Sequence, residues 1–228
     1  MAKKFIPFEP AWWSFGLPGY GDTLATYTRV SGEYLPPLAL NQFRGEFQWL
    51  EPLEGYIDKE MAVHRDPQET RREHPERLQA VRHQAAGIEM ALPDSFLKLM
   101  DSMQLQDRIP SCTACYFDLT DHIVNSPNET DRHLIRFLSD QQGCLFWYLY
   151  LDNQDELGVV VSELLLDEPG WQNALHGKSV IDHIKLCGPS LEAFIYRFWI
   201  ENKIWFALDD ESASLSDEQR SYLSFFER

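Results

Sequence analysis

Residues 190–208 read SLEAFIYRFWIENKIWFAL, and this stretch decides the fold class. Its large apolar residues recur at the spacing of one helical face: Leu191, Phe194, Ile195, Phe198, Trp199 and Trp205. The charged residues fall on the other side of the same helix: Glu192, Arg197, Glu201 and Lys203. The pattern predicts a long amphipathic helix with Ser190 as its N-cap. A face so rich in large rings needs a sheet or a broad groove to cover it.

The segments before this helix have the composition of strands. Residues 113–117, 134–138, 144–151 and 157–161 are separated by polar or glycine-containing turns. Short connections between successive strands predict an antiparallel meander. In residues 144–151 both alternating faces are apolar, so this strand is expected to be central and covered on both sides.

Three further helices are predicted. The first has Pro75 in its first turn and apolar residues at helical spacing up to Ile88. A second, short helix begins near Pro93. A third begins at Ser216, with Gln219 at the capping-box position.

The first 60 residues differ in composition from the rest. They contain proline, glycine and aromatic residues throughout, which excludes long helices but supplies too many rings for a solvated linker. Residues 1–60 are interpreted as an extension of short strands and turns that packs on a main domain of residues 61–228. The best hairpin candidate is residues 27–35, with its turn at Ser31-Gly32.

Composition places the chain among folded proteins. It has 228 residues, of which 44% are hydrophobic and 13% aromatic, enough for a well-cored domain with an extension. No apolar run approaches the ~20 residues of a membrane-spanning helix, and no apolar segment of signal-peptide length follows the two N-terminal lysines. We therefore expect a cytoplasmic protein without a membrane partner, and reduced cysteines.

The formal net charge of −16 is unevenly distributed. Residues 1–90 hold 10 Lys and Arg against 13 Asp and Glu, a net charge of −3, and residues 91–228 hold 10 against 23, a net charge of −13. Such a surface repels nucleic acid and anionic membranes and attracts basic proteins. Acidic surfaces also keep proteins soluble, so charge alone does not identify a partner.

One pattern suggests metal or redox chemistry. Cys112 and Cys115 form a lone C-x-x-C, and His122 and His133 follow it. A redox C-x-x-C opens a helix whereas this one enters a strand, and the histidine spacing does not match a zinc finger. We expect structural thiols, no metal, no cofactor and no catalytic residue. A zinc- or thiol-dependent enzyme that uses these four residues is the alternative.

The order of helix, helix, strand meander and aromatic helix resembles the SUKH superfamily, which contains the yeast cell-wall-synthesis regulator and many bacterial immunity proteins. The resemblance lies in LPDSFLKLM (92–100), DQQGCLFWYLYLD (140–152) and SLEAFIYRFWIEN (190–202). It covers residues 75–208, and the insertion at 111–131 departs from the family pattern.

This resemblance implies an α+β fold in which helices flank a curved antiparallel sheet. It also implies a non-catalytic role, since bacterial members commonly neutralise a toxin, often a nuclease, by binding it. The acidic excess fits a basic partner of this kind. A structural subunit of a larger assembly, docking through residues 1–60, is a second alternative.

Two sets of residues follow from this interpretation. The core is expected to contain Phe96, Phe146, Trp147, Tyr148, Phe194, Phe198, Trp199 and Trp205. Two turns of the meander are expected to be exposed and to contact the partner protein through Asp140, Gln141, Gln142, Asp152, Asp155 and Glu156.

Overall fold

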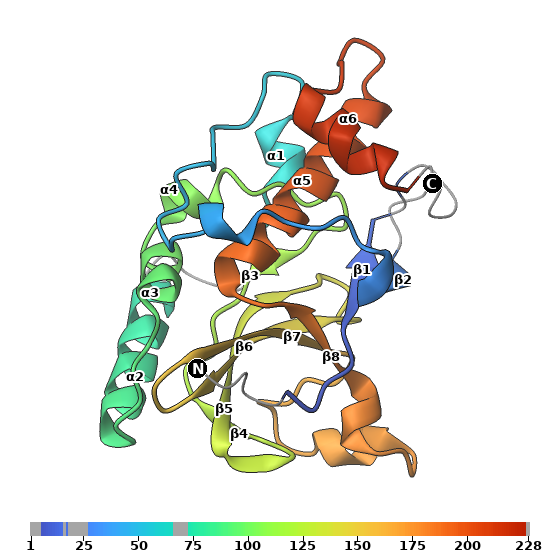
Figure 1. Ribbon diagram of the computed structural model, residues 1–228. Helices are drawn as coiled ribbons and strands as arrows, with labels where there is room; N and C mark the ends of the chain where they lie inside the picture. Colours follow the sequence, from blue (N-terminus) through green and yellow to red (C-terminus); the bar gives the residue numbers. More distant parts are fainter. Residues whose placement is uncertain (1–5, 16, 18–26, 66–72, 227–228) are drawn as a thin grey trace.

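Helix α5 (Leu191–Asp209) lies against one face of an antiparallel sheet in the computed structural model (Figure 1). The structure describes residues 6–15, 17, 27–65 and 73–226. Across these residues, helices flank the sheet, and the predicted α+β class is confirmed.

Within the described chain, the main sheet has six strands in the order β3-β5-β6-β7-β8, with β4 paired to β5. All of these pairs are antiparallel. The strands are β3 (Tyr116–Phe117), β4 (Val124–Ser126), β5 (Glu129–Ser139), β6 (Phe146–Asp152), β7 (Glu156–Ser162) and β8 (Ile184–Gly188). The predicted meander corresponds to β5, β6 and β7, whereas only the last two residues of 113–117 pair as a strand.

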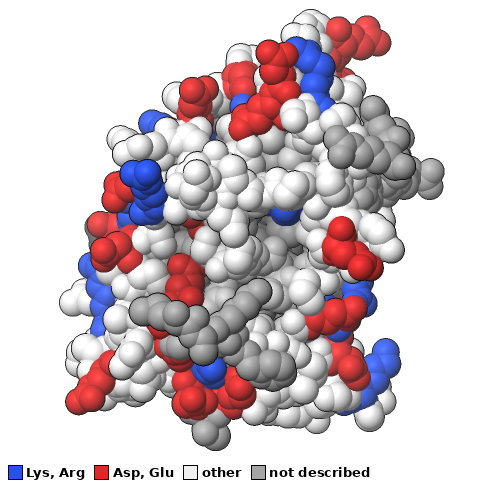
Figure 2. Space-filling view, in the orientation of Figure 1, with Lys and Arg blue, Asp and Glu red and all other residues white. Residues whose placement is uncertain are grey.

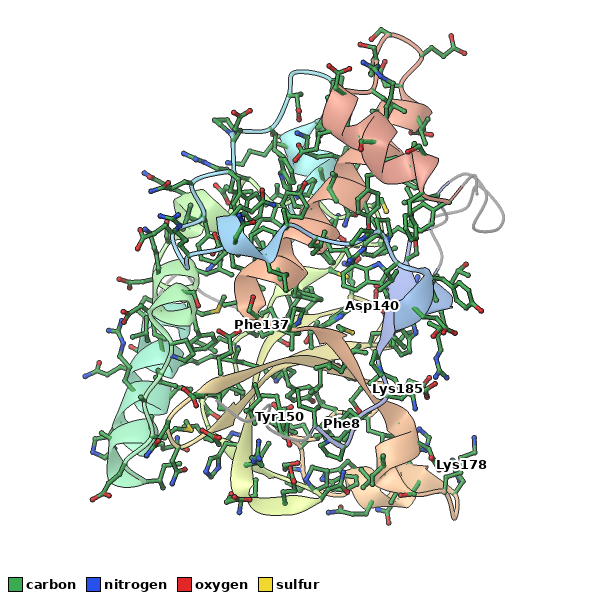
Figure 3. All side chains as sticks on the ribbon, in the orientation of Figure 1. Phe8, Phe137, Asp140, Tyr150, Lys178 and Lys185 are labelled. Carbon is green, nitrogen blue, oxygen red and sulfur yellow. The ribbon has the colours of Figure 1, made fainter. Side chains whose placement is uncertain are left out.

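The central strand β6 is covered on both faces, as predicted. Trp147 and Leu149 belong to the apolar core on the α5 side, and Tyr148 and Tyr150 to a second core on the other side. Figure 3 shows Tyr150 and Phe8 together on the side of the sheet away from α5, and their ring centroids lie 5.2 Å apart. Successive side chains of β6 point to opposite faces of the sheet and thus contribute to two apolar layers.

The long connection between β7 and β8 covers this second face (Figure 1). It contains two 3-10 helices, η3 (Trp171–Leu175) and η4 (Val180–His183). Leu164 and Leu166 from the same connection are buried against the sheet residues Tyr148 and Val160.

Helix α5 begins as predicted, because the Ser190 hydroxyl accepts a hydrogen bond from the backbone N–H of Ala193 at 3.2 Å. Its aromatic face packs on the sheet, and the Phe194 ring lies 5.8 Å from the Phe137 ring. The helix is not exposed on its other side, however. The four charged residues of that side are buried as well: Glu192, Arg197, Glu201 and Lys203.

The N-terminal segment accounts for this burial. Strand β1 (Ala11–Ser14) pairs antiparallel with β2 (Thr28–Ser31), and the buried Trp12 indole N–H donates to the Glu201 carboxylate of α5 at 2.8 Å. Figure 1 shows the chain after β2 crossing in front of α5. The N-terminal segment therefore packs on the charged side of the helix.

The predicted hairpin over residues 27–35 is wrong. Strand β2 pairs with β1 instead, and Gly32 begins the 3-10 helix η1 (Gly32–Tyr34). The Gly32 N–H donates to the Pro10 carbonyl at 3.1 Å, and a Cβ at Gly32 would lie 2.7 Å from the Pro10 Cβ. Close approach of two backbone segments, rather than a turn, therefore requires glycine here.

The remaining helices lie around α5 and at the side of the sheet (Figure 1). They are η2 (Leu40–Gln42), α1 (Lys59–Ala62), α2 (Glu73–Gly87), α3 (Asp94–Met100), α4 (Met103–Gln106) and α6 (Asp217–Ser224). The predicted capping box of α6 is formed, since Ser216 and Gln219 exchange backbone and side-chain hydrogen bonds. Among the described helices, none combines the length and apolar character needed to cross a membrane.

Six of the eight expected core residues are at most 4% exposed: Phe96, Trp147, Tyr148, Phe194, Phe198 and Trp199. Phe146 and Trp205 are partly buried and pack against the edges of the two cores.

Candidate protein-binding surface

Two charged residues of α5 belong to a buried polar network. The Glu201 carboxylate accepts hydrogen bonds from the Trp12 indole N–H at 2.8 Å and from the Tyr222 hydroxyl at 2.6 Å. The Tyr222 oxygen in turn accepts a hydrogen bond from Arg197 at 2.9 Å. Burial raises the pKa of Glu201, because an apolar environment disfavours the carboxylate. The network joins β1, α5 and α6.

The surface beyond the C-terminal end of α5 is acidic, and Figure 2 shows acidic side chains at the top of the molecule. We define the acidic end as Glu54, Asp209, Asp210, Glu211, Asp217 and Glu218. Burial raises the pKa of the Tyr56 hydroxyl, and the nearby negative charges of Glu54 and Asp210 raise it as well. Lys203 pairs with Glu54, and Arg220 pairs with Asp217 at 2.5 Å. Within the described residues, neither Asp209 nor Glu211 forms an ion pair.

A cavity of about 410 Å³ adjoins the acidic end. This α6 cavity lies between residues 36–42 and α6, and Leu38, Tyr222 and Phe225 are among the residues of its walls. Glu218 also lines it and accepts a hydrogen bond from the Tyr196 hydroxyl at 2.5 Å. Because Glu218 belongs to both features, the cavity opens directly beside the acidic end.

The residues predicted to contact a partner differ in exposure. Gln141, Gln142 and Asp155 are exposed. Asp140 is only 3% exposed, so its predicted exposure is wrong. Its carboxylate accepts two backbone N–H bonds within its own turn, at 3.1 and 3.2 Å, and one from the Tyr27 hydroxyl at 2.9 Å. Figure 3 shows Asp140 on the α5 side of the sheet.

The other two predicted residues, Asp152 and Glu156, form hydrogen bonds within the protein. Asp152 is partly exposed, and its carboxylate accepts the backbone N–H groups of Gln154 and Asp155 in the β6–β7 turn. Glu156 is partly buried and accepts the backbone N–H of Leu191, the first residue of α5. Burial, together with the nearby Glu192 carboxylate, raises the pKa of Glu156 to about 7, against the opposing effect of the Leu191 N–H. Any role of the exposed residues in partner binding stays a prediction.

Cys112, Cys115, His122 and His133 do not form a common site. In the described part of the chain, no three His, Cys, Asp or Glu side chains are placed to hold a metal ion. His122 instead lies 2.9 Å from the Asp167 carbonyl oxygen. Burial raises the pKa of Cys115 to about 11 and that of Cys112 well above its usual value. Both thiols are therefore protonated at neutral pH, which makes them weak nucleophiles.

A buried ion network fixes the chain after β7 to the sheet. Arg136 of β5 binds the Asp167 carboxylate at 2.9 Å and also binds Asp118, and the Tyr148 hydroxyl donates to Asp167 at 2.9 Å. Burial alone would raise the pKa of Asp167, but the bonds from Arg136 outweigh this effect and lower it. Because these charges satisfy one another, the network has a structural role.

Comparison with models of known protein families, with curated proteins and with solved structures found no match.

Proposed function

We propose that this protein acts without catalysis, by binding a basic partner protein in the cytoplasm. The partner class that fits best is a basic toxin domain such as a nuclease, by the resemblance of the sequence to SUKH immunity proteins. The observation that carries the proposal is the acidic end beside the α6 cavity, a recess lined by both apolar and polar side chains. Interfaces commonly combine an apolar anchor with a charged rim in this way.

The position of the acidic end on α5 supports a binding role. The C-terminal end of a helix carries partial negative charge, and α5 has no basic residue in its last turn. Asp209 and Glu211 add two negative charges there, and the partial negative charge of the helix end disfavours both. The Asp210 carboxylate is different, because it accepts two hydrogen bonds from Ser212, at 2.8 and 2.6 Å, which lower its pKa. Asp209 and Glu211 are therefore the charges that favour contact with an external cation.

An electrostatic field of this kind acts mainly on the rate of association. Complementary charge raises association rate constants by about 10–1,000-fold at low salt. We therefore expect the double variant Asp209→Lys/Glu211→Lys to associate with the partner about tenfold more slowly than the wild-type protein. The partner is first isolated from the protein's own cells and purified, and binding is then measured by surface plasmon resonance at low and high salt.

A matched variant controls for net charge. Glu168→Lys/Asp182→Lys changes two exposed acids in the β7–β8 connection and alters the total charge equally. We expect this variant to associate at a rate close to wild type. A partner that binds both double variants equally fast, or whose binding does not weaken with salt, would show that the acidic end is not the contact surface. A purified nuclease partner that stays fully active in a one-to-one mixture would exclude the immunity role.

A further inference from the structure

A second cavity of about 360 Å³ lies on the other side of residues 36–38. Its walls are mainly apolar and include Pro10, Leu35, Leu38 and Leu186, and Arg197 of α5 also lines it. This Arg197 cavity falls within the range of about 300–1,000 Å³ in which small-molecule sites occur. Figure 2 shows the middle of this face as largely uncharged, with a small area of basic atoms among neutral ones.

Arg197 is buried without a carboxylate partner. It is 7% exposed, and its guanidinium donates to two neutral oxygens, the Pro36 carbonyl at 2.7 Å and the Tyr222 hydroxyl at 2.9 Å. Among the described residues, no carboxylate lies within 4.0 Å of it. A guanidinium has five N–H donors, so these two bonds leave binding capacity.

Glu201 is linked to Arg197 only through the Tyr222 hydroxyl. The two charges interact across this hydroxyl, since Arg197 lowers the pKa of Glu201 against the larger effect of burial. The aromatic rings of Trp12 and Tyr222 each lie 5.8 Å from the guanidinium carbon. Ring faces stabilise a cation but give it no counter-charge. A buried charge is most favourable when it is paired directly, so an anion in the cavity would give the guanidinium a direct charge partner.

We propose that the Arg197 cavity binds a small carboxylate that has an apolar tail, with the carboxylate on the Arg197 guanidinium and the tail against Leu35, Leu38 and Leu186. The guanidinium matches the two oxygens of a carboxylate. The apolar walls favour a monoanion with a hydrocarbon body over inorganic phosphate. This cavity and the α6 cavity share residues 36–38 as walls. The carboxylate site does not depend on the proposed partner protein.

The test compares hexanoate with hexanamide, which has the same tail but no charge, and with inorganic phosphate. Isothermal titration calorimetry on the full-length protein gives each affinity, and the melting temperature gives an independent measure, since a ligand that binds only the folded state raises it. We expect hexanoate to bind about 10–100-fold more tightly than hexanamide, because a charge-assisted hydrogen bond is the difference. Phosphate is expected not to bind measurably.

Two kinds of variant locate the site. Arg197→Gln should weaken hexanoate binding at least about tenfold and leave hexanamide binding unchanged. Arg197 is buried, so its replacement can also disturb folding. A pair of variants at Pro37, which is exposed and lines the cavity, avoids this problem. Pro37→Asp should weaken hexanoate binding about tenfold through charge repulsion, and Pro37→Asn should not. The proposal would be overturned if hexanoate and hexanamide bound with equal affinity, or if neither bound. It would also be overturned if the two Pro37 variants bound hexanoate with equal affinity.

Discussion

Replacing Glu192 by alanine is expected to lower the free energy of unfolding by about 4 kcal/mol. The Glu192 carboxylate accepts three hydrogen bonds from residues 45–49, namely those of the Gly45 N–H, the Phe47 N–H at 2.9 Å and the Trp49 indole N–H at 2.9 Å. Glu192→Ala leaves these three donors without an acceptor, and each loss costs about 1–3 kcal/mol. Urea unfolding with linear extrapolation measures the change.

Glu192→Gln is the matched variant for this prediction. Its amide oxygen can still accept hydrogen bonds from Phe47 and Trp49. Its NH₂ group, however, faces the Gly45 N–H, and two donors cannot form a hydrogen bond with each other. We expect this variant to lose about 1–2 kcal/mol, clearly less than the alanine variant. If alanine also costs less than about 1 kcal/mol, Glu192 does not hold the N-terminal segment on α5.

The periodicity of α5 predicted its length, N-cap and sheet-facing residues, because these depend on neighbours within a few positions along the chain. It could not predict that the charged side is buried. Gly45, Phe47 and Trp49, which bind Glu192, and Trp12, which binds Glu201, are 143–189 positions away in the sequence, whereas Tyr222 is 21 positions from Glu201. Charged residues at helical spacing are typical of a solvated face, and only the folded chain shows which distant donors satisfy them.

The sheet shows the same division between local and distant contacts. The β6–β7 pair was predictable because a short turn joins two strands of suitable composition. Residues 27–35 have the same local features, yet the partner of β2 is β1, on the far side of a long connection. Strand β8 was not predicted because 21 residues, 163–183, separate it from its partner β7, so no short turn marks the pair.

The candidate binding surface was predictable only as a property of the whole chain. The acidic excess of residues 91–228 indicated a basic partner, but the turns chosen from the sequence included Asp140 and Glu156, whose carboxylates bind backbone N–H groups of the protein itself. Asp209 and Glu211 could have been selected from the sequence, since they lie at the end of a helix with no basic residue in its last turn. The Arg197 cavity could not be predicted from the sequence, because its walls come from three separate parts of the chain.

The free energy of unfolding of the wild-type protein is expected to fall by about 3 kcal/mol between about pH 5 and pH 8 because of the Glu156 carboxyl group. Replacing Glu156 by glutamine is expected to abolish this decrease. Burial and the Glu192 carboxylate raise the pKa of Glu156 from 4.5 to about 7. Below 4.5 the group is protonated in both states and has no effect. Between 4.5 and 7 the unfolded chain releases the proton while the folded protein keeps it, so the free energy of unfolding falls with rising pH.

Glutamine keeps the oxygen that accepts the Leu191 N–H, so at about pH 5 the variant should match wild type, and at about pH 8 it should be more stable by up to about 3 kcal/mol. Glu156 lines a cavity at the start of α5 together with Arg44, Glu46, Asp94 and Glu192. Taking the difference between the two proteins at each pH cancels the titrating groups that do not interact with Glu156. Asp155→Asn, at an exposed position of the same turn, is the control and should show no such difference. If wild type and Glu156→Gln differ by the same amount at both pH values, the carboxyl group of Glu156 is ionised in the folded protein, and the cavity at the start of α5 holds two negative charges.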